Sequence, residues 1–244
     1  MRGKRGSTAK EGSSGRSALS KLRIGGLVRF SANDYPGALA AVVFCQGCPW
    51  NCEYCHNPHL LAPAPASSLN WDEVLHFLEK RSGLLDSVVF SGGEPTLQSG
   101  LLDAIGQVKN MGFRVGLHTS GAYPERLQEL LANIDWVGLD IKAPFSRYEK
   151  ITGVTGSGER ALASALMVER DPADFEFRTT LHPALTSEKI LEEVADELSK
   201  IGGGKWQIQP FSARGSRIGG VSRVRMEGLA GRLARGNLQV AVRC

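Results

Sequence analysis

Long apolar runs are absent from this sequence of 244 residues. No segment reaches the roughly 18 consecutive apolar residues that a membrane-spanning helix needs. The first residues, MRGKRGSTAKEGSSGRSALSK, also lack the apolar stretch of a secretory signal, and we interpret residues 1–22 as a disordered basic extension. These absences argue against a membrane protein, and we expect a cytoplasmic one.

A strong excess of one charge is also absent once the N-terminal residues are set aside. Residues 1–23 carry seven Lys and Arg against one acidic residue, Glu11, whereas the whole chain has a net charge of +4. The remainder is therefore close to neutral, and a short basic tail is usually just solvated. We expect no nucleic-acid partner.

Cysteine is almost missing outside one short stretch. Four of the five cysteines lie within eleven residues, at Cys45, Cys48, Cys52 and Cys55. Cysteines this close together are poorly placed to join distant segments, so a disulfide framework is disfavoured and metal binding or catalysis is favoured. Cys244, the last residue, is interpreted as a free surface thiol.

Strand-like and helix-like patterns alternate along the rest of the chain. Six apolar strand patterns are each followed by a helix pattern, such as residues 70–83, where Asn70 and Glu73 form a typical helix start. This alternation predicts parallel strands with right-handed crossovers. About 220 residues are short for a closed barrel of eight units, which takes roughly 250. We predict an α/β fold, a partial (β/α)6 barrel in a single domain spanning residues 23–244; a doubly wound open sheet is the competing architecture.

The chemically distinctive residues follow the predicted strands. The cysteines follow the first strand, and the later strands are followed by SGGEP (91–95), HTSG (118–121), DIK (140–142) and QPF (209–211). Because the carboxyl ends of parallel strands meet at one end of the sheet, we expect the chemistry to sit there.

The cysteine stretch can be divided in two ways. Two Cys-x-x-Cys pairs would suit a four-thiolate zinc site, but such pairs are usually separated by a longer loop than the three residues found here. The second division is Cys48-x-x-x-Cys52-x-x-Cys55, three soft thiolates that suit an iron–sulfur cluster. Three thiolates on a four-iron cluster leave one iron open, whereas Cys45 as a fourth ligand would close the site. We therefore favour Cys45 as a small buried side chain.

The second division, with Tyr54 just before the last cysteine, resembles the Cys-x-x-x-Cys-x-aromatic-Cys signature of the radical S-adenosylmethionine superfamily. The resemblance implies a [4Fe–4S] cluster held by Cys48, Cys52 and Cys55, which are then both metal ligands and catalytic residues. It also implies S-adenosylmethionine, bound at the open iron beside Tyr54.

The SGGEP stretch resembles the turn that holds the amino group of the methionine moiety in this family. The matching residues are Gly92, Gly93 and Glu94. Glycines let the backbone approach a ligand closely, and the Glu94 carboxylate could accept a hydrogen bond from an ammonium group. We expect these three residues to bind S-adenosylmethionine.

Residues 29–60, RFSANDYPGALAAVVFCQGCPWNCEYCHNPHL, resemble the activating enzymes of glycyl radical enzymes, and among them the activase of anaerobic ribonucleoside-triphosphate reductase. The resemblance continues more loosely to about Phe211. It implies contacts to S-adenosylmethionine near Asp140 and Lys142, for which an ion pair at the strand end is the alternative. His118 stands where activases often have an aspartate that helps to bind a monovalent cation, and a histidine removes that hard anionic ligand, so we leave the cation site unassigned.

The resemblance also implies a reaction. An external one-electron donor such as flavodoxin or ferredoxin reduces the cluster, S-adenosylmethionine is cleaved, and a 5′-deoxyadenosyl radical takes a hydrogen atom from a glycine Cα of a partner. Anaerobic ribonucleotide reductase is the expected partner. The alternatives are a radical enzyme acting on a small molecule, similar to deazaguanine-forming enzymes, and a non-catalytic zinc or iron–sulfur protein. With five cysteines, a second cluster is not expected.

Overall fold

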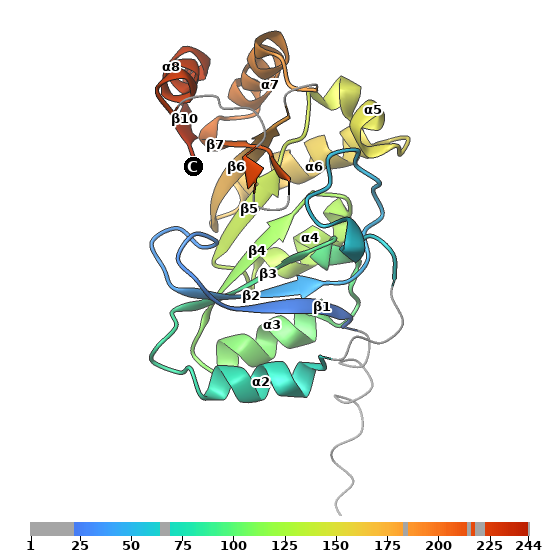
Figure 1. The fold of residues 1–244 in the computed structure, drawn as a ribbon, viewed down its shortest axis with the longest axis vertical. Coiled ribbons are helices and arrows are strands. Elements are labelled where there is room, and N and C mark those ends of the chain that lie inside the picture. The colour runs from blue at the N-terminus through green and yellow to red at the C-terminus, as the bar shows by residue number, and fades with distance from the viewer. Residues whose placement is uncertain (1–21, 64–68, 183–184, 214–215, 218–222, 244) are drawn as a thin grey trace, which may run out of the picture.

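One eight-stranded sheet organises the protein (Figure 1), and its strand order follows the order of the chain. The computed structural model describes residues 22–63, 69–182, 185–213, 216–217 and 223–243. In sheet order the strands are β1 (Ile24–Ser31), β2 (Ala40–Cys45), β3 (Ser87–Gly92), β4 (Arg114–Thr119), β5 (Trp136–Asp140), β6 (Asp174–Leu181), β7 (Gly204–Pro210) and β10 (Leu238–Val242). The first pair, β1 with β2, is antiparallel, and every later pair is parallel.

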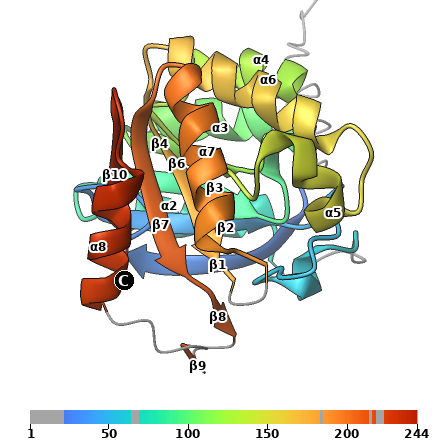
Figure 2. The same cartoon turned by 90° about the horizontal axis from the view of Figure 1, so that it is seen from above.

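The helices follow the strands and pack on the outer side of the curved sheet (Figures 1 and 2). They are α2 (Trp71–Glu79), α3 (Leu101–Asn110), α4 (Pro124–Leu131), α5 (Tyr148–Thr152), α6 (Ser157–Arg170), α7 (Glu188–Lys200) and α8 (Arg223–Leu233). Three short 3-10 helices lie in the connections: η1 (Pro58–Leu60), η2 (Pro95–Leu97) and η3 (Phe145–Arg147). The two-residue strands β8 (Ser212–Ala213) and β9 (Ser216–Arg217) pair with each other.

Local sequence explains where these helices begin. Asn70 and Glu73 form the predicted capping box of α2, because each side chain accepts a hydrogen bond from the other's backbone N–H at 2.9 Å. Pro124 opens α4, where its missing N–H costs nothing. None of the helices in the described part of the chain is long and apolar enough to cross a membrane.

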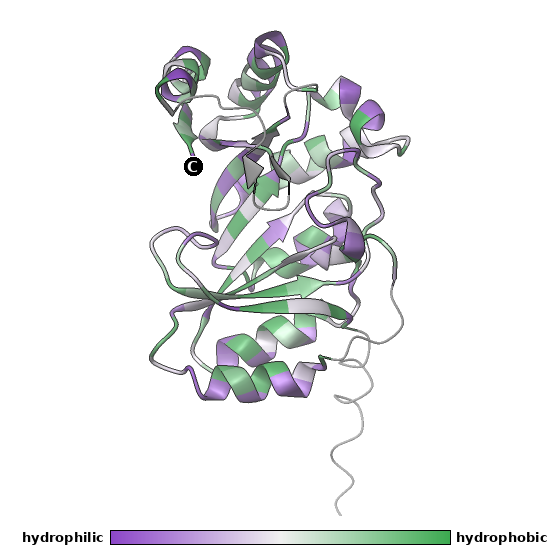
Figure 3. Cartoon of the chain, viewed as in Figure 1, coloured by the Kyte–Doolittle hydropathy of each residue, from purple (hydrophilic) through white to green (hydrophobic). Residues whose placement is uncertain are grey.

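The sheet separates an outer core from an inner face. Alternate side chains of β2 point to opposite sides: Ala41, Val43 and Cys45 join the main core under the helices, whereas Ala40 and Val42 face the inside of the sheet. In Figure 3 β2 is largely hydrophobic, whereas hydrophilic segments interrupt the later strands, and α2 and α3 show a hydrophobic and a hydrophilic side. Burial on both faces is expected for parallel strands that are covered by helices.

The predicted partial (β/α)6 barrel is confirmed. Six parallel strands, β2 to β7, are each followed by helical structure, and the sheet ends at β1 and β10 without closing. A doubly wound sheet would reverse its strand order at one point; this sheet does not, so that alternative is wrong. The alternation of strands and helices did not predict β1, an antiparallel addition whose half-exposed side chains give no clear strand pattern.

The domain boundary needs a correction of one residue. Leu22, which we assigned to the N-terminal extension, is buried and packs into the main core. The packed part of the chain therefore begins no later than Leu22, because burying an apolar side chain is favourable. The rest of the predicted extension, residues 1–21, lies outside the described residues, as does Cys244.

Candidate active site

A cavity of about 280 Å³ lies at the carboxyl ends of the parallel strands. This is close to the lower end of the roughly 300–1,000 Å³ that is typical of ligand pockets. Eight of the nine residues that the sequence singled out line it: Cys48, Cys52, Tyr54, Cys55, Gly92, Gly93, Asp140 and Lys142. A larger hollow, of about 1020 Å³, lies between α4 and α6 and is lined by none of them.

The four clustered cysteines do not point the same way. Cys48, Cys52 and Cys55 line the cavity, whereas Cys45 ends β2 with its side chain fully buried in the outer core. Because successive side chains of a strand alternate, the neighbour Phe44 lines the cavity and Cys45 does not. The predicted burial of Cys45 is confirmed.

The cysteine loop has little regular structure and is held together at its base by Gln46. The buried side-chain amide of Gln46 donates to the carbonyl oxygens of His59 (3.1 Å) and Ala62 (2.5 Å), on the far side of the loop. Backbone bonds add to this closure, from Gly47 N to Leu60 O (2.8 Å) and from Cys48 N to Leu61 O (3.1 Å). Sequence analysis did not identify Gln46, since its role depends on carbonyl groups more than ten residues away.

The thiols lie in surroundings where a nearby positive charge promotes loss of their protons. Burial raises the pKa of the Cys48 thiol to about 12, and burial also raises the pKa of Cys52. The Lys142 ammonium group lowers both pKa values, because a positive charge favours a nearby thiolate. Thiols bind metals as thiolates, after losing their protons. The positive charge of a bound metal would stabilise these thiolates further.

Gly92 and Gly93 let the turn after β3 lie directly against the cysteine loop. Gly92 has φ +120°, and a Cβ there would come within 2.3 Å of the Cys45 backbone nitrogen. A Cβ at Gly93 would come within 2.3 Å of the Gly47 carbonyl oxygen. Both positions therefore require glycine. The turn is also tied to the loop by hydrogen bonds from Gly93 N to Cys45 O and from Glu94 N to Gly47 O, both 2.9 Å.

Glu94 is held by donors of the protein itself, and the direct ligand contact that we expected stays a prediction. Its side chain is fully buried and does not line the cavity. The carboxylate accepts five hydrogen bonds: Oε1 from Thr96 N, Thr96 Oγ1 and Thr119 Oγ1, and Oε2 from Ser120 N and Ser120 Oγ. With its acceptor sites used in this way, Glu94 joins the turn after β3 to the end of β4 and begins η2 as its N-cap.

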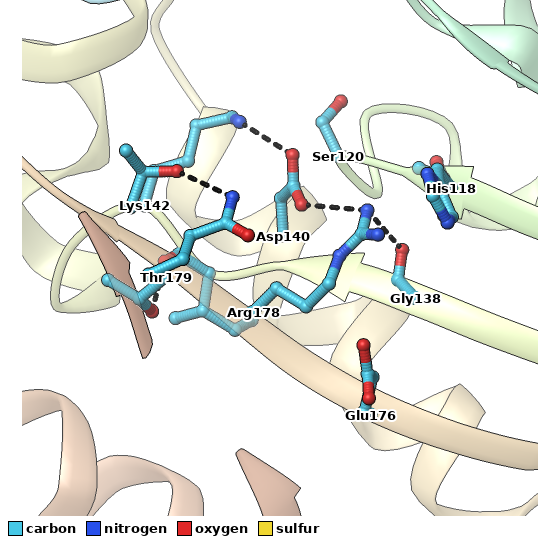
Figure 4. Close-up of polar contacts among 12 residues, drawn as sticks. His118, Ser120, Gly138, Asp140, Lys142, Glu176, Arg178 and Thr179 are labelled. Atoms are coloured by element: carbon cyan, nitrogen blue, oxygen red, sulfur yellow. Dashed lines mark hydrogen bonds and ion pairs between the residues drawn. The ribbon is translucent and has the colours of Figure 1, made fainter. Parts of the chain in front are cut away.

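Asp140 and Lys142 belong to an ionic group at the ends of β5 and β6 (Figure 4). Asp140 Oδ2 accepts from Lys142 Nζ at 3.2 Å, and Asp140 Oδ1 accepts from Arg178 Nη2 at 3.1 Å. Burial opposes the ionisation of Asp140, but Lys142 and Arg178 outweigh it and lower the pKa to about 2. For Lys142, burial lowers the pKa but Asp140 raises it further, so the net shift is upward and the ammonium stays charged. The ion pair that we named as the alternative is present, and it faces the cavity.

Tyr54 and Tyr148 enclose Lys142 from two sides. The Tyr54 hydroxyl donates to the Lys142 carbonyl oxygen at 3.4 Å, and burial raises the Tyr54 pKa to about 12. The Tyr148 hydroxyl accepts from Lys142 N at 3.0 Å and donates to Asp140 O at 3.3 Å. These contacts fix the strand-end segment that carries the ionic group. No sequence pattern indicated Tyr148, which comes from the separate helix α5.

His118 is a buried histidine with a backbone partner. Its Nε2 lies 2.8 Å from the carbonyl oxygen of Asp34, in the DYPG segment before β2. Burial and then Arg178 lower its pKa well below the ordinary value, so the ring is neutral and Nε2–H is the donor in this contact. The side chain lines the cavity but supplies no anionic ligand there.

The donor set fits an iron–sulfur cluster better than a single ion. Across the described ranges, no three His, Cys, Asp or Glu side chains are grouped so as to hold one metal ion. In a cluster each thiolate binds a different iron, so three separated thiols around one cavity are the appropriate arrangement. Gly92 and Gly93 line the same cavity as the three thiols.

A family model described as the radical SAM superfamily matches residues 42–196 of this chain. The chain belongs to the radical SAM superfamily. Two proteins that are named as activating enzymes are similar in sequence to this chain. A putative glycyl-radical enzyme activating enzyme of Methanocaldococcus jannaschii is 32% identical over 182 residues, which are 72% of this chain and 75% of the relative. The pyruvate formate-lyase-activating enzyme of Clostridium pasteurianum is 35% identical over 162 residues, 64% of this chain and 67% of the relative.

Solved radical SAM structures share the fold. Streptococcus suis SuiB bound to S-adenosylmethionine superposes with a TM-score of 0.64 at 14% identity; the match covers 82% of this chain but about half (48%) of SuiB. QueE from Escherichia coli superposes with a TM-score of 0.55 at 18% identity, over 96% of this chain and 99% of QueE. At these identities the likeness establishes the fold alone. Membership of the radical SAM superfamily makes this chain an enzyme and implies a [4Fe–4S] cluster and S-adenosylmethionine.

Proposed function

We propose that Cys48, Cys52 and Cys55 hold a single [4Fe–4S] cluster with one open iron. The observation that carries this proposal is that these three thiols line one cavity while Cys45 lies on the opposite face of the sheet. When bound, the cluster and S-adenosylmethionine supply the one-electron cleavage that yields a radical able to take a hydrogen atom from a glycine Cα. The chain supplies binding, orientation and exclusion of water.

Five of the other cavity residues bind and position the S-adenosylmethionine. Gly92 and Gly93 line the cavity where the cysteine loop and β3 meet, and their lack of a side chain suits a close approach by the methionine moiety. Asp140 and Lys142 present one charge of each sign to the cavity and suit the polar groups of the ligand. Tyr54 forms a wall beside them. Glu94 acts indirectly, by holding the glycine turn in place through Thr96, Thr119 and Ser120.

The proposed substrate is a glycyl radical enzyme. The similarity to the named activating enzymes supports this class. Anaerobic ribonucleoside-triphosphate reductase is the first partner that we propose, from the DYPG and QGCPWNCEYCHNP segments. Pyruvate formate-lyase is the second candidate, because relatives from Clostridium pasteurianum and Streptococcus mutans are named for it. A one-electron donor such as flavodoxin or ferredoxin would reduce the cluster, and the free thiols suit the reducing cytoplasm.

The cluster assignment is tested by two cysteine variants. We would reconstitute the protein anaerobically with iron and sulfide, reduce it with dithionite, add S-adenosylmethionine, and record the EPR spectrum and 5′-deoxyadenosine. Cys45→Ala should keep the four-iron signal and the cleavage, whereas Cys52→Ala should lose both. Loss of metal in Cys45→Ala, or zinc in place of iron, would instead indicate a structural four-thiolate site.

The partner is tested by adding each candidate to the active preparation. A glycyl radical signal on anaerobic ribonucleotide reductase would support the first choice, and a signal on pyruvate formate-lyase alone would move the assignment to the second. Cleavage of S-adenosylmethionine without a radical on either protein would contradict both partners and favour a small-molecule substrate.

A further inference from the structure

Arg243 connects the two ends of the open sheet. It follows β10 directly, at one edge of the sheet, and its Nη2 donates to the carbonyl oxygen of Asn33 at 2.8 Å. Asn33 lies in the loop between β1 and β2, at the opposite edge. The two residues are 210 positions apart in the sequence. The contact therefore spans the side on which the partial barrel does not close.

The position of Arg243 is fixed from within the protein. Its backbone N–H donates to Ile208 O at 3.0 Å, which continues the pairing of β10 with β7. Its Nη2 also lies 3.5 Å from Oε1 of Glu176, a buried carboxylate oxygen with no hydrogen-bond donor. A buried carboxylate needs compensating charge, so Glu176 holds the guanidinium in the lining of the cavity. Arg243 lines that cavity together with Arg178 and Gln209.

The contact with Asn33 can be exchanged at low cost. The same loop is already anchored from β4, because Asp34, the next residue, bonds to His118 through its carbonyl oxygen. The Asn33 bond is exposed, so water can replace the guanidinium on that carbonyl. Releasing Arg243 would therefore leave the loop in place and free several N–H donors in the cavity lining.

The N–H donors of Arg243 are suited to the backbone carbonyl groups of a glycine-containing segment. Glycine has no side chain, so the chain around a reacting glycine must be recognised partly through its backbone carbonyl groups. An Arg guanidinium presents five N–H donors in a fixed fork. On the basis of the proposed function, we propose that Arg243 is a specificity-determining residue for the protein substrate. It transfers its hydrogen bond from Asn33 O to a backbone carbonyl of the entering glycine loop.

The test separates substrate recognition from cleavage. We would compare wild type, Arg243→Ala and Arg243→Lys, with Arg232→Ala as the matched control. Arg232 also lies near the C-terminus, in α8, but it pairs with Glu188 on the outside of the molecule. The substrates are anaerobic ribonucleotide reductase and a peptide copy of its glycine loop. The readouts are KM for each substrate from the glycyl radical signal, and 5′-deoxyadenosine formed without substrate.

We expect Arg243→Ala to raise KM for both substrates about tenfold relative to Arg232→Ala, a larger change than any in cleavage without substrate. Arg243→Lys, which keeps the charge but not the fork, should fall between. An unchanged or lower KM would overturn the proposal, as would a parallel loss of substrate-free cleavage, which would indicate a damaged cavity. If wild type cleaves S-adenosylmethionine but forms no radical on either substrate, the proposed function itself fails, an outcome distinct from a working enzyme that is indifferent to Arg243.

Discussion

At the scale of single residues, Glu94 shows how a recognisable sequence can have an unexpected physical role. Its type and position suggest a ligand-binding carboxylate, but the folded chain surrounds it with five hydrogen-bond donors from Thr96, Thr119 and Ser120. A buried carboxylate is stable only when its oxygens are paired in this way. The residue thus contributes to the site by fixing the glycine turn.

We predict that Glu94→Ala lowers both stability and ligand affinity. The change leaves several buried donors unpaired, which should reduce the free energy of unfolding by about 3–5 kcal/mol. Denaturant unfolding measures the stability, and calorimetry on the reconstituted protein measures S-adenosylmethionine affinity; Glu129→Ala, on the exposed face of α4, is the control. Lost affinity with unchanged stability would contradict the indirect role and restore a direct contact.

Gln46 gives a second prediction at this scale. Gln46→Leu keeps the size of the side chain but removes both donors to His59 O and Ala62 O. The cysteine loop should open more often, and stability should fall by about 1–3 kcal/mol because two carbonyl groups lose a buried partner. Hydrogen exchange of the amides of residues 48–57 in the iron-free protein should quicken, and iron retention after reconstitution should fall. The exposed Gln128→Leu serves as control; equal exchange in the two variants would refute the closure role.

At the scale of elements, the turn after β3 and the loop after β2 form one unit. Gly93 lies against the Gly47 carbonyl, and the backbone bonds of Gly93 and Glu94 tie the two segments together. The cluster loop and the S-adenosylmethionine turn are therefore positioned by contact with each other. Neither segment can move without the other.

We predict opposite effects for two Gly→Ala substitutions. Gly93→Ala should separate the turn from the loop, since its Cβ would meet the Gly47 carbonyl at 2.3 Å, and both stability and S-adenosylmethionine binding should fall. Gly106→Ala, inside α3 with nothing within 4 Å of its Cβ, should stabilise the protein by about 0.5–1 kcal/mol. Thermal unfolding of both variants provides the comparison. A Gly93→Ala protein as stable as wild type would show that the close approach is unimportant.

At the scale of the whole molecule, charged side chains from separate strands meet in and beside the cavity. Arg243 of the C-terminal segment, Glu176 and Arg178 of β6, Asp140 of β5 and Lys142 after it alternate in sign. Each buried charge has an opposite charge nearby, which offsets its loss of hydration. The arrangement depends on the complete sheet.

This balance predicts a pH dependence for Asp140. Its pKa of about 2 lies below the ordinary 3.8, so the carboxylate stabilises the fold above about pH 4, and this stabilisation is lost as the pH falls towards 2. The difference in unfolding free energy between wild type and Asp140→Asn should therefore narrow from about pH 5 to pH 3, as measured by urea unfolding. The exposed Asp103→Asn is the control. A difference that does not change with pH would show that Asp140 gains nothing from Lys142 and Arg178.

Local sequence determined the parallel architecture and the positions of the predicted site residues. The capping box at Asn70, Pro124 at the start of α4 and the alternation of apolar strands with helices are short-range signals, and the structure confirms each. The spacing of Cys48, Cys52 and Cys55 likewise needs no partner elsewhere in the chain. Patterns of this kind reflect periodicity and backbone preference, which act over a few residues.

Tertiary structure alone decided the contacts between distant segments. The closure by Gln46, the bonds to Glu94 from Thr119 and Ser120, the pairing of Asp140 with Arg178 and the bond from Arg243 to Asn33 join residues between 13 and 210 positions apart. The physical reason is that hydrogen bonds and ion pairs depend on the positions of atoms in space. Those positions follow from sheet order and packing, and no local pattern in the sequence records them.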